Sequence, residues 1–174
     1  MDITNIIAQG FGVLAYIIVG YSFYREKKLE ILFVQFISSI VFGIHYYLLS
    51  GITGAACSFL SAIMMFNVYI YEKKAKESKK TTAMIMVAIM LTIISIITYE
   101  NVFSVFPIVG TAIAAASFIF DSETFIRIVG VVAAGCWLVY GIICMSYSAM
   151  IFESILIITT TISIIKNRKK EINN

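Results

Sequence analysis

All 13 Lys and Arg residues of this chain fall on one side of a map of seven hydrophobic segments. The predicted segments are Ile3–Tyr24, Ile31–Leu49, Ile52–Tyr71, Thr81–Tyr99, Val102–Phe120, Phe125–Met145 and Ala149–Ile165. If the segments cross a bilayer alternately, every basic residue follows segment 1, 3 or 7 or lies at the start of segment 6. Lys and Arg near the ends of membrane spans stay in the cytoplasm. This asymmetry therefore predicts seven transmembrane helices, with the N-terminus outside and the C-terminus inside.

The composition leaves little room for anything other than membrane helices. Of the 174 residues, 60% are hydrophobic, and each segment approaches the roughly 20 apolar residues that cross a hydrocarbon core. We therefore predict an all-α membrane protein without a separate soluble domain. The net charge is +3, and part of the positive charge lies in a Lys-rich loop. Glu72 and Glu77 partly neutralise the charge of that loop. We expect this charge to contact anionic lipid and not nucleic acid.

Two stretches of the chain align at a shift of 95 residues, which indicates an internal repeat. The matched pairs are Phe42 with Trp137, His45 with Tyr140, Gly51 with Ser146, Gly54 with Ala149, and Ser58 with Glu153. We predict a 3+1+3 plan in which residues 3–71 and 102–165 form parallel triple-helix repeats, related by an axis near the membrane normal. Residues 72–99 are expected to form a cytoplasmic loop and a lipid-facing linker helix, and residues 166–174 a cytoplasmic tail.

Four short motifs are similar to those of a known family. They are Ala8-Gln9-Gly10-Phe11-Gly12, Gly43-Ile44-His45 running to Leu49-x-Gly51, Pro107-Ile108-Val109-Gly110-Thr111, and Met150-Ile151-x-Glu153. On these motifs the chain resembles the YgjV-type bacterial inner membrane proteins. The 3+1+3 plan with an external N-terminus also resembles that of the SWEET, PQ-loop and PnuC-type transporters. The resemblance implies a multi-pass protein of the bacterial inner membrane with a transporter-like fold.

The chain departs from the SWEET-type pattern in two respects. Those carriers have hinge prolines in both halves, whereas Pro107 is the single proline here. Their sugar pockets use paired Trp and Asn residues from both halves, whereas Trp137 and Asn67 have no symmetric mates in this sequence. The resemblance therefore does not favour sugar as the substrate.

Two ionisable side chains lie within the predicted spans. Glu153 is five residues into the last segment, and His45 is five residues from the outer end of the second. With a rise of about 1.5 Å per residue, both are expected at a similar depth. An ionisable group inside a membrane is costly unless it is paired, hydrated or functional. We predict that the two meet across a central cavity and share a proton. The alternatives are that Glu153 extends to the outer headgroups and that His45 packs against a hydroxyl or carbonyl group.

Two aromatic residues complete the predicted site. Tyr140 occupies the repeat position of His45, and Trp137 lies about one turn deeper on the same helix face. We expect His45, Glu153, Trp137 and Tyr140 to line one cavity that binds a substrate or a proton and opens to the outer face in at least one state. Core packing is the alternative for Trp137.

The sequence contains no recognisable catalytic constellation. It has a single His, no cluster of His, Cys and Asp, and no Gly-rich phosphate loop. We therefore predict no enzyme, no metal site and no cofactor. The leading hypothesis is a small-solute transporter of the inner membrane that works by alternating access, with proton coupling as an option. The alternative is a non-transporting membrane receptor or assembly subunit on the same fold. The expected partners are membrane lipid and an unidentified small-molecule substrate, and a homo-oligomer is left open.

Overall fold

The structure is a computed structural model that describes residues 2–22, 24–25, 27–74, 80–99, 101–117 and 123–172. The helices within these ranges are α1 (Ile3–Ser22), α2 (Lys28–Leu48), α3 (Ile52–Lys73), α4 (Lys80–Ile97), α5 (Val105–Ser117), α6 (Glu123–Ile143) and α7 (Tyr147–Ile172). A short 3-10 helix, η2 (Val102–Ser104), leads into α5. No strand occurs in the described ranges, so the predicted all-α class is confirmed.

Each predicted segment coincides with a helix, and the largest difference is at the end of the last one. The seventh segment was predicted to end at Ile165, whereas α7 continues to Ile172. The hydrophobic pattern stops at Ile165, but residues 166–172 contain no Pro or Gly that would end a helix. The predicted loop at 75–79, the predicted end of the fifth segment at 118–120, and residues 173–174 lie outside the described residues.

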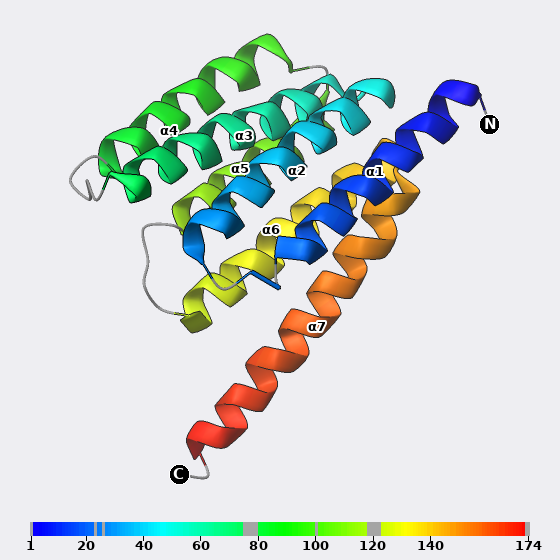
Figure 1. Cartoon of the computed structure of the whole chain (residues 1–174). Coiled ribbons are helices and arrows are strands. Elements are labelled where there is room, and N and C mark those ends of the chain that lie inside the picture. The colour runs from blue at the N-terminus through cyan, green and yellow to red at the C-terminus, as the bar shows by residue number, and fades with distance from the viewer. Residues whose placement is uncertain are drawn as a thin grey trace.

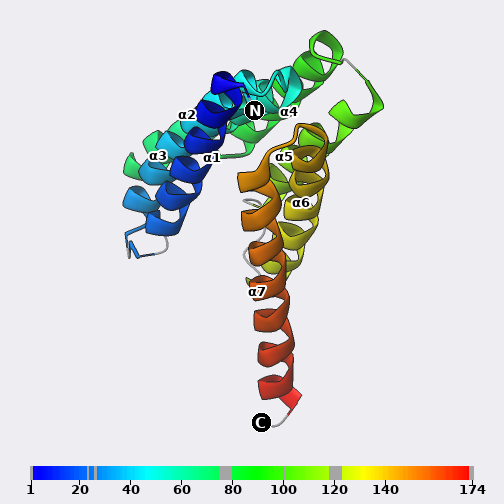
Figure 2. The same ribbon diagram turned by 90° about the vertical axis from the view of Figure 1, so that its right-hand side faces the viewer.

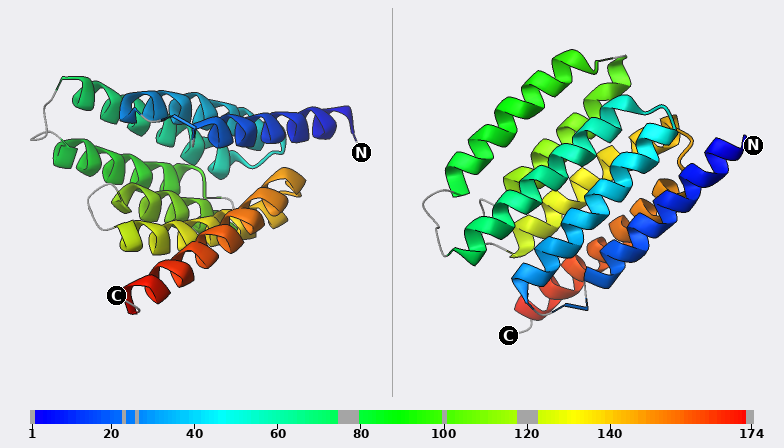
Figure 3. Two further views of the ribbon diagram at one scale, coloured as in Figure 1. Left: turned by 60° about the horizontal axis from the view of Figure 1, so that its bottom comes forward. Right: turned by 45° about the horizontal axis from the view of Figure 1, so that its top comes forward.

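The helices form two groups that meet at one end of the molecule and diverge at the other, as Figure 2 shows. In the first group α2 lies between α1 and α3, and in the second α6 lies between α5 and α7 (Figures 1 and 3). We call the end with the N-terminus and the α2–α3 and α6–α7 turns the closed end. The opposite end, which carries the α1–α2 link, is the divergent end.

Helix α4 lies at the edge of the molecule and packs against both α3 and α5 (Figure 1). Val87 and Leu91, one turn apart, are buried in a core with Leu60 and Met64 of α3. Its other faces carry exposed side chains such as Ile89. One face of α4 therefore joins the two groups, and its other faces remain exposed.

The lengths and outward faces of the helices fit a membrane. Four stretches are long and apolar enough to cross one, namely Ile3–Ser22, Leu29–Leu48, Ile52–Lys73 and Tyr147–Ile165. Shorter apolar stretches of the described residues are Ile85–Ile97, Val102–Ala115 and Arg127–Ile143. Many large apolar side chains on these helices point outward. A soluble monomer rarely exposes apolar patches of that extent, whereas lipid solvates them.

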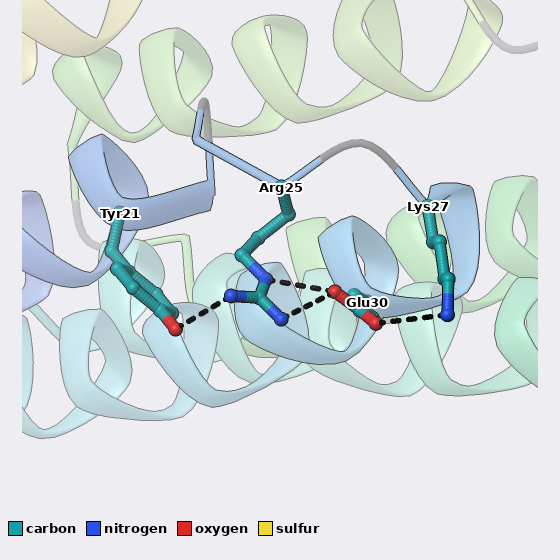
Figure 4. Close-up of polar contacts among 4 residues, drawn as sticks. All are labelled: Tyr21, Arg25, Lys27 and Glu30. Carbon is teal, nitrogen blue, oxygen red and sulfur yellow. Dashed lines mark hydrogen bonds and ion pairs between the residues drawn. The ribbon is translucent and has the colours of Figure 1, made fainter.

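At the divergent end, a small polar cluster fixes the link between α1 and α2 (Figure 4). Arg25 donates from Nε and Nη2 to the Glu30 carboxylate, at 2.8 and 2.6 Å, and from Nη1 to the Tyr21 hydroxyl at 3.0 Å. The Lys27 ammonium lies 3.9 Å from the same carboxylate. The hydrogen bond to Glu30 raises the pKa of Arg25 above its ordinary value, so the guanidinium stays charged. Exposed ion pairs of this kind add little stability, so the cluster mainly sets the path of the chain.

The α2–α3 and α6–α7 turns share one backbone geometry. Ser50 and Met145 have left-handed φ values of 59° and 53°. After each of them, an N–H reaches back five residues to a helix carbonyl, in the Schellman pattern of helix ends. These bonds run from Gly51 to Tyr46 and from Ser146 to Gly141, both at 2.8 Å. The two turns are therefore equivalent at the shift of 95 residues found in the sequence.

Glycine at position 145 should stabilise the protein. We expect Met145→Gly to raise the free energy of unfolding by about 1 kcal/mol, because a side chain in the left-handed region costs roughly that much and glycine avoids it. The Met145 side chain is exposed, so its loss removes little packing. Chemical denaturation in detergent measures the change. Met145→Ala, which keeps a Cβ in the same strained conformation, is the control, and equal stability of the two variants would refute the explanation.

Candidate functional site

His45 is fully buried at the closed end and connects the two groups of helices. Its Nδ1 lies 2.6 Å from the Ala8 carbonyl oxygen on α1, and its Nε2 lies 2.7 Å from Oγ of Ser146 in the α6–α7 turn. Because a carbonyl oxygen can only accept, Nδ1 carries a proton, and Nε2 of the neutral ring accepts the Ser146 hydroxyl. Ser146 Oγ in turn accepts the Ala149 N–H at 3.2 Å, which caps the start of α7. The imidazole thus links α1, α2 and α7.

Gln9 and Gly12 of α1 strengthen this connection. The Gln9 amide donates to the Met145 carbonyl at 2.8 Å and accepts the Ser148 N–H at 3.3 Å. A Cβ at Gly12 would overlap Oγ of Ser148, which follows the α6–α7 turn, and would lie only 2.8 Å from Cε1 of His45. Glycine therefore allows α1 to approach the α6–α7 turn closely.

Tyr140 makes the corresponding connection from the second group to the first. It is 4% exposed, and its hydroxyl accepts the Gly54 N–H at 3.0 Å. That N–H belongs to the first turn of α3, where helix donors have no partner of their own. Any Cβ at Gly54 would overlap the Tyr140 ring. The Tyr46 ring packs between the two groups, with its centroid 5.5 Å from that of Tyr140 and 5.4 Å from that of Trp137.

A cavity of about 150 Å³ lies between the two groups. It is lined by Tyr16, Ser39, Phe42, Tyr46, Ser58, Ser61, Trp137 and Glu153. Of the lining residues in the described part of the chain, Glu153 is the one acid, and none is Lys, Arg or His. Oε1 of Glu153 accepts a hydrogen bond from the Tyr16 hydroxyl at 2.8 Å. The cavity thus combines one carboxyl group with hydroxyl groups and aromatic rings.

Aromatic contacts hold the Tyr16 hydroxyl in place. The Tyr16 ring stacks on Phe152 of α7 at a centroid distance of 4.6 Å and forms a T-shaped pair with Phe42 of α2 at 4.7 Å. Such stacked and edge-on pairs contribute beyond simple packing. α1, α2 and α7 therefore together position the hydroxyl that faces Glu153.

His45 and Glu153 do not pair as the sequence predicted. His45 contacts Ala8, whereas Glu153 contacts Tyr16, about two turns further along α1, or about 12 Å along its axis. The prediction counted residues from the helix ends and assumed that these ends were level. In the structure His45 reaches Ser146, just before α7 begins, so Glu153 lies deeper than His45. Each side chain has a different partner.

The four predicted residues thus occupy two levels. Glu153 and Trp137 line the cavity, whereas His45 and Tyr140 are absent from its lining and bridge the two groups at the closed end. The cavity lies on the divergent side of those bridges, at the level of Tyr16. Whether a side chain lines the cavity or bridges the two groups depends on the depth and tilt of the packed helices. Counting residues from the helix ends does not give either quantity.

Several lining residues were not singled out from the sequence as parts of a site. Ser58 and Phe42 could have been identified from the sequence, because the repeat alignment matches Ser58 to Glu153 and Phe42 to Trp137. Both members of each pair line the cavity. Tyr16 had no such signal, because its role depends on α1 packing beside α7.

Metal binding finds no support in the part of the chain that the structure describes. No group of three His, Cys, Asp or Glu side chains there could hold a metal ion. None of Cys57, Cys136 and Cys144 forms a disulfide, and Cys57 is buried.

Comparison with known families gives one match. The model of a family described as Imp-YgjV, bacterial inner membrane protein, matches residues 6–171. This match confirms the resemblance inferred from the four short motifs. No curated protein and no solved structure matches the chain.

Proposed function

This chain belongs to the Imp-YgjV family of bacterial inner membrane proteins, and from that premise we propose that it is a small-solute transporter working by alternating access. The observation that carries the proposal is the cavity around Glu153, which lies between two helix groups that His45 and Tyr140 bridge at the closed end. Transporters built from repeats bind their solutes at such an interface. In this state the closed end is sealed, and a solute reaches Glu153 from the divergent end.

The orientation in our proposal is N-terminus outside, with seven membrane crossings. It is supported by the basic residues Arg25, Lys27, Lys73, Lys74 and Arg127, all of which lie near helix ends on the divergent side. Basic residues near span ends are retained in the cytoplasm. The divergent end then faces the cytoplasm, the closed end faces outward, and the conformation described is inward-facing.

The proposed parallel repeat is supported by reciprocal contacts at the closed end. His45 of α2 bonds Ser146 of the α6–α7 turn. Its repeat partner, Tyr140 of α6, has its hydroxyl 3.0 Å from a Cβ built on Gly51 of the α2–α3 turn. Gly51 is the repeat partner of Ser146. Reciprocal contacts of this kind are the signature of a two-fold relation, so each group seals the other through equivalent positions.

Proton coupling at Glu153 is the finer part of the proposal. A bare carboxylate inside a membrane is costly, so a proton neutralises it when no solute is bound. The titratable groups that face it are the hydroxyls of Tyr16 from α1 and Tyr46 from α2. His45 has no part in this exchange, because its two ring nitrogens are bonded to the Ala8 carbonyl and the Ser146 hydroxyl.

Two-sided labelling of the cavity tests the transport proposal without a known substrate. We expect Ser61→Cys, in a chain with Cys57, Cys136 and Cys144 replaced by alanine, to react with a membrane-impermeant maleimide from both sides. Inverted vesicles expose the cytoplasmic side, and spheroplasts expose the outer side. Alternating access brings the same position to each side in turn.

A lipid-facing position provides the control. Thr92 lies on an exposed face of α4 and bonds its own helix carbonyl, so Thr92→Cys should react from neither side. If position 61 reacts from one side only, the transport proposal fails. A receptor or assembly subunit with a fixed cavity then becomes the better explanation.

A further inference from the structure

The charge of the cavity lining selects the sign of its ligand. Glu153 is the one charged side chain among the described residues that line the cavity, and its hydrogen-bond donor, Tyr16, is neutral. The uncompensated carboxylate disfavours an anion and attracts a cation, because opposite charges interact strongly away from water. The other polar groups of the lining are hydroxyls of serine and tyrosine.

The aromatic rings select the kind of cation. Tyr16, Phe42, Tyr46 and Trp137 all contribute to the lining. The faces of such rings attract ammonium groups, most strongly for Trp, and aromatic cages of this type bind alkylated ammonium ions. Ca²⁺ and Mg²⁺ take six or more oxygen ligands, which one carboxyl group and rings do not offer, and no described group of three His, Cys, Asp or Glu side chains could hold another metal. The lining therefore suits an organic cation better than a metal ion.

The volume sets the size of the ligand. The cavity measures about 150 Å³. An engineered apolar cavity of about that volume binds benzene. A ligand of a few carbon atoms around one nitrogen fits this space.

We propose that the cavity binds a small organic ammonium ion, with its charge between the Glu153 carboxylate and the rings of Trp137, Phe42 and Tyr46. The ammonium proposal rests on the proposed function, because it takes this cavity to be the solute site. It adds the class of substrate that the transporter would move.

Trp137 is the one Trp of the chain, so its fluorescence reports on the cavity directly. Choline is the test ligand, and 3,3-dimethylbutan-1-ol, which replaces its nitrogen by carbon, is the matched neutral control. We expect choline to change the Trp137 emission saturably in the purified full chain. The neutral analogue should need a concentration at least about tenfold higher, because it lacks the charge that the carboxylate and rings bind.

Substitutions of the lining residues test whether choline binds in this cavity. Glu153→Gln keeps the shape of the side chain and should weaken choline binding at least about tenfold, while binding of the neutral analogue stays unchanged. Phe42→Leu should weaken choline more than the neutral analogue. Equal half-saturation by choline and its analogue in the unmodified protein would overturn the proposal, whether or not the variants fold. Unchanged choline binding in a folded Glu153→Gln variant would also overturn it.

The two proposals fail in different ways. If choline and its analogue bind alike but Ser61→Cys is labelled from both sides, the ammonium ligand is excluded and transport stands. If choline is preferred but position 61 is labelled from one side only, the ammonium site stands and the transport proposal falls.

Discussion

Replacing His45 with alanine is expected to lower the free energy of unfolding in detergent by about 3 kcal/mol, since large-to-small changes at buried sites cost roughly 2–5 kcal/mol. The imidazole is 0% exposed, so its loss leaves a space between α1, α2 and the α6–α7 turn. It also removes two interhelical hydrogen bonds, each worth about 0.6 kcal/mol on average in a membrane protein. Chemical denaturation followed by circular dichroism gives the change.

A neighbouring side chain supplies the control for His45→Ala. Tyr47 on the same helix is 68% exposed, so Tyr47→Ala should change stability by less than about 0.5 kcal/mol. A second measurement tests whether His45 also keeps the closed end shut, beyond its contribution to packing. When combined with Ser61→Cys, His45→Ala should increase labelling from the outer side, because the closed end then separates more easily. Stability equal to that of Tyr47→Ala would contradict the role assigned to His45.

Much of the fold was predictable because hydrophobic length is a local property. The seven segments correspond to α1 to α7, and the short outer links correspond to tight turns. The repeat shift of 95 residues also identified Ser50 and Met145 as equivalent, since they occupy the same left-handed position in the two turns. The continuation of α7 to Ile172 was missed because hydropathy locates the edge of the membrane and not the end of a helix.

The site was predictable only in part because it depends on helix tilt and depth. The cost of a buried carboxyl group drew attention to Glu153, and the repeat gave Trp137 its counterpart Phe42 on the opposite wall. Counting residues placed His45 beside Glu153, whereas packing gives them different partners, Ser146 for His45 and Tyr16 for Glu153. Tyr16 could not be found, since the contact between α1 and α7 leaves no local pattern.

The closed end can be locked with one substitution. A Cβ at Gly51 would lie 3.0 Å from Sγ of Cys144, which belongs to the other group of helices and is within reach of a disulfide. The φ of Gly51 is −85°, a value that cysteine adopts without strain. Gly51→Cys should therefore form a disulfide with the native Cys144 under oxidising conditions. The bond holds the α2–α3 turn to the end of α6 and prevents the outward-facing state.

The most direct test of alternating access is the labelling of position 61 with and without this lock. The chain carries Gly51→Cys and Ser61→Cys, retains Cys144, and has Cys57 and Cys136 replaced by alanine. Mass spectrometry identifies both the disulfide and the labelled position. The account predicts labelling of position 61 from the cytoplasmic side alone when the disulfide is formed, and from both sides after reduction. Labelling from the outer side that persists in the oxidised protein, or that is absent in both states, would contradict it.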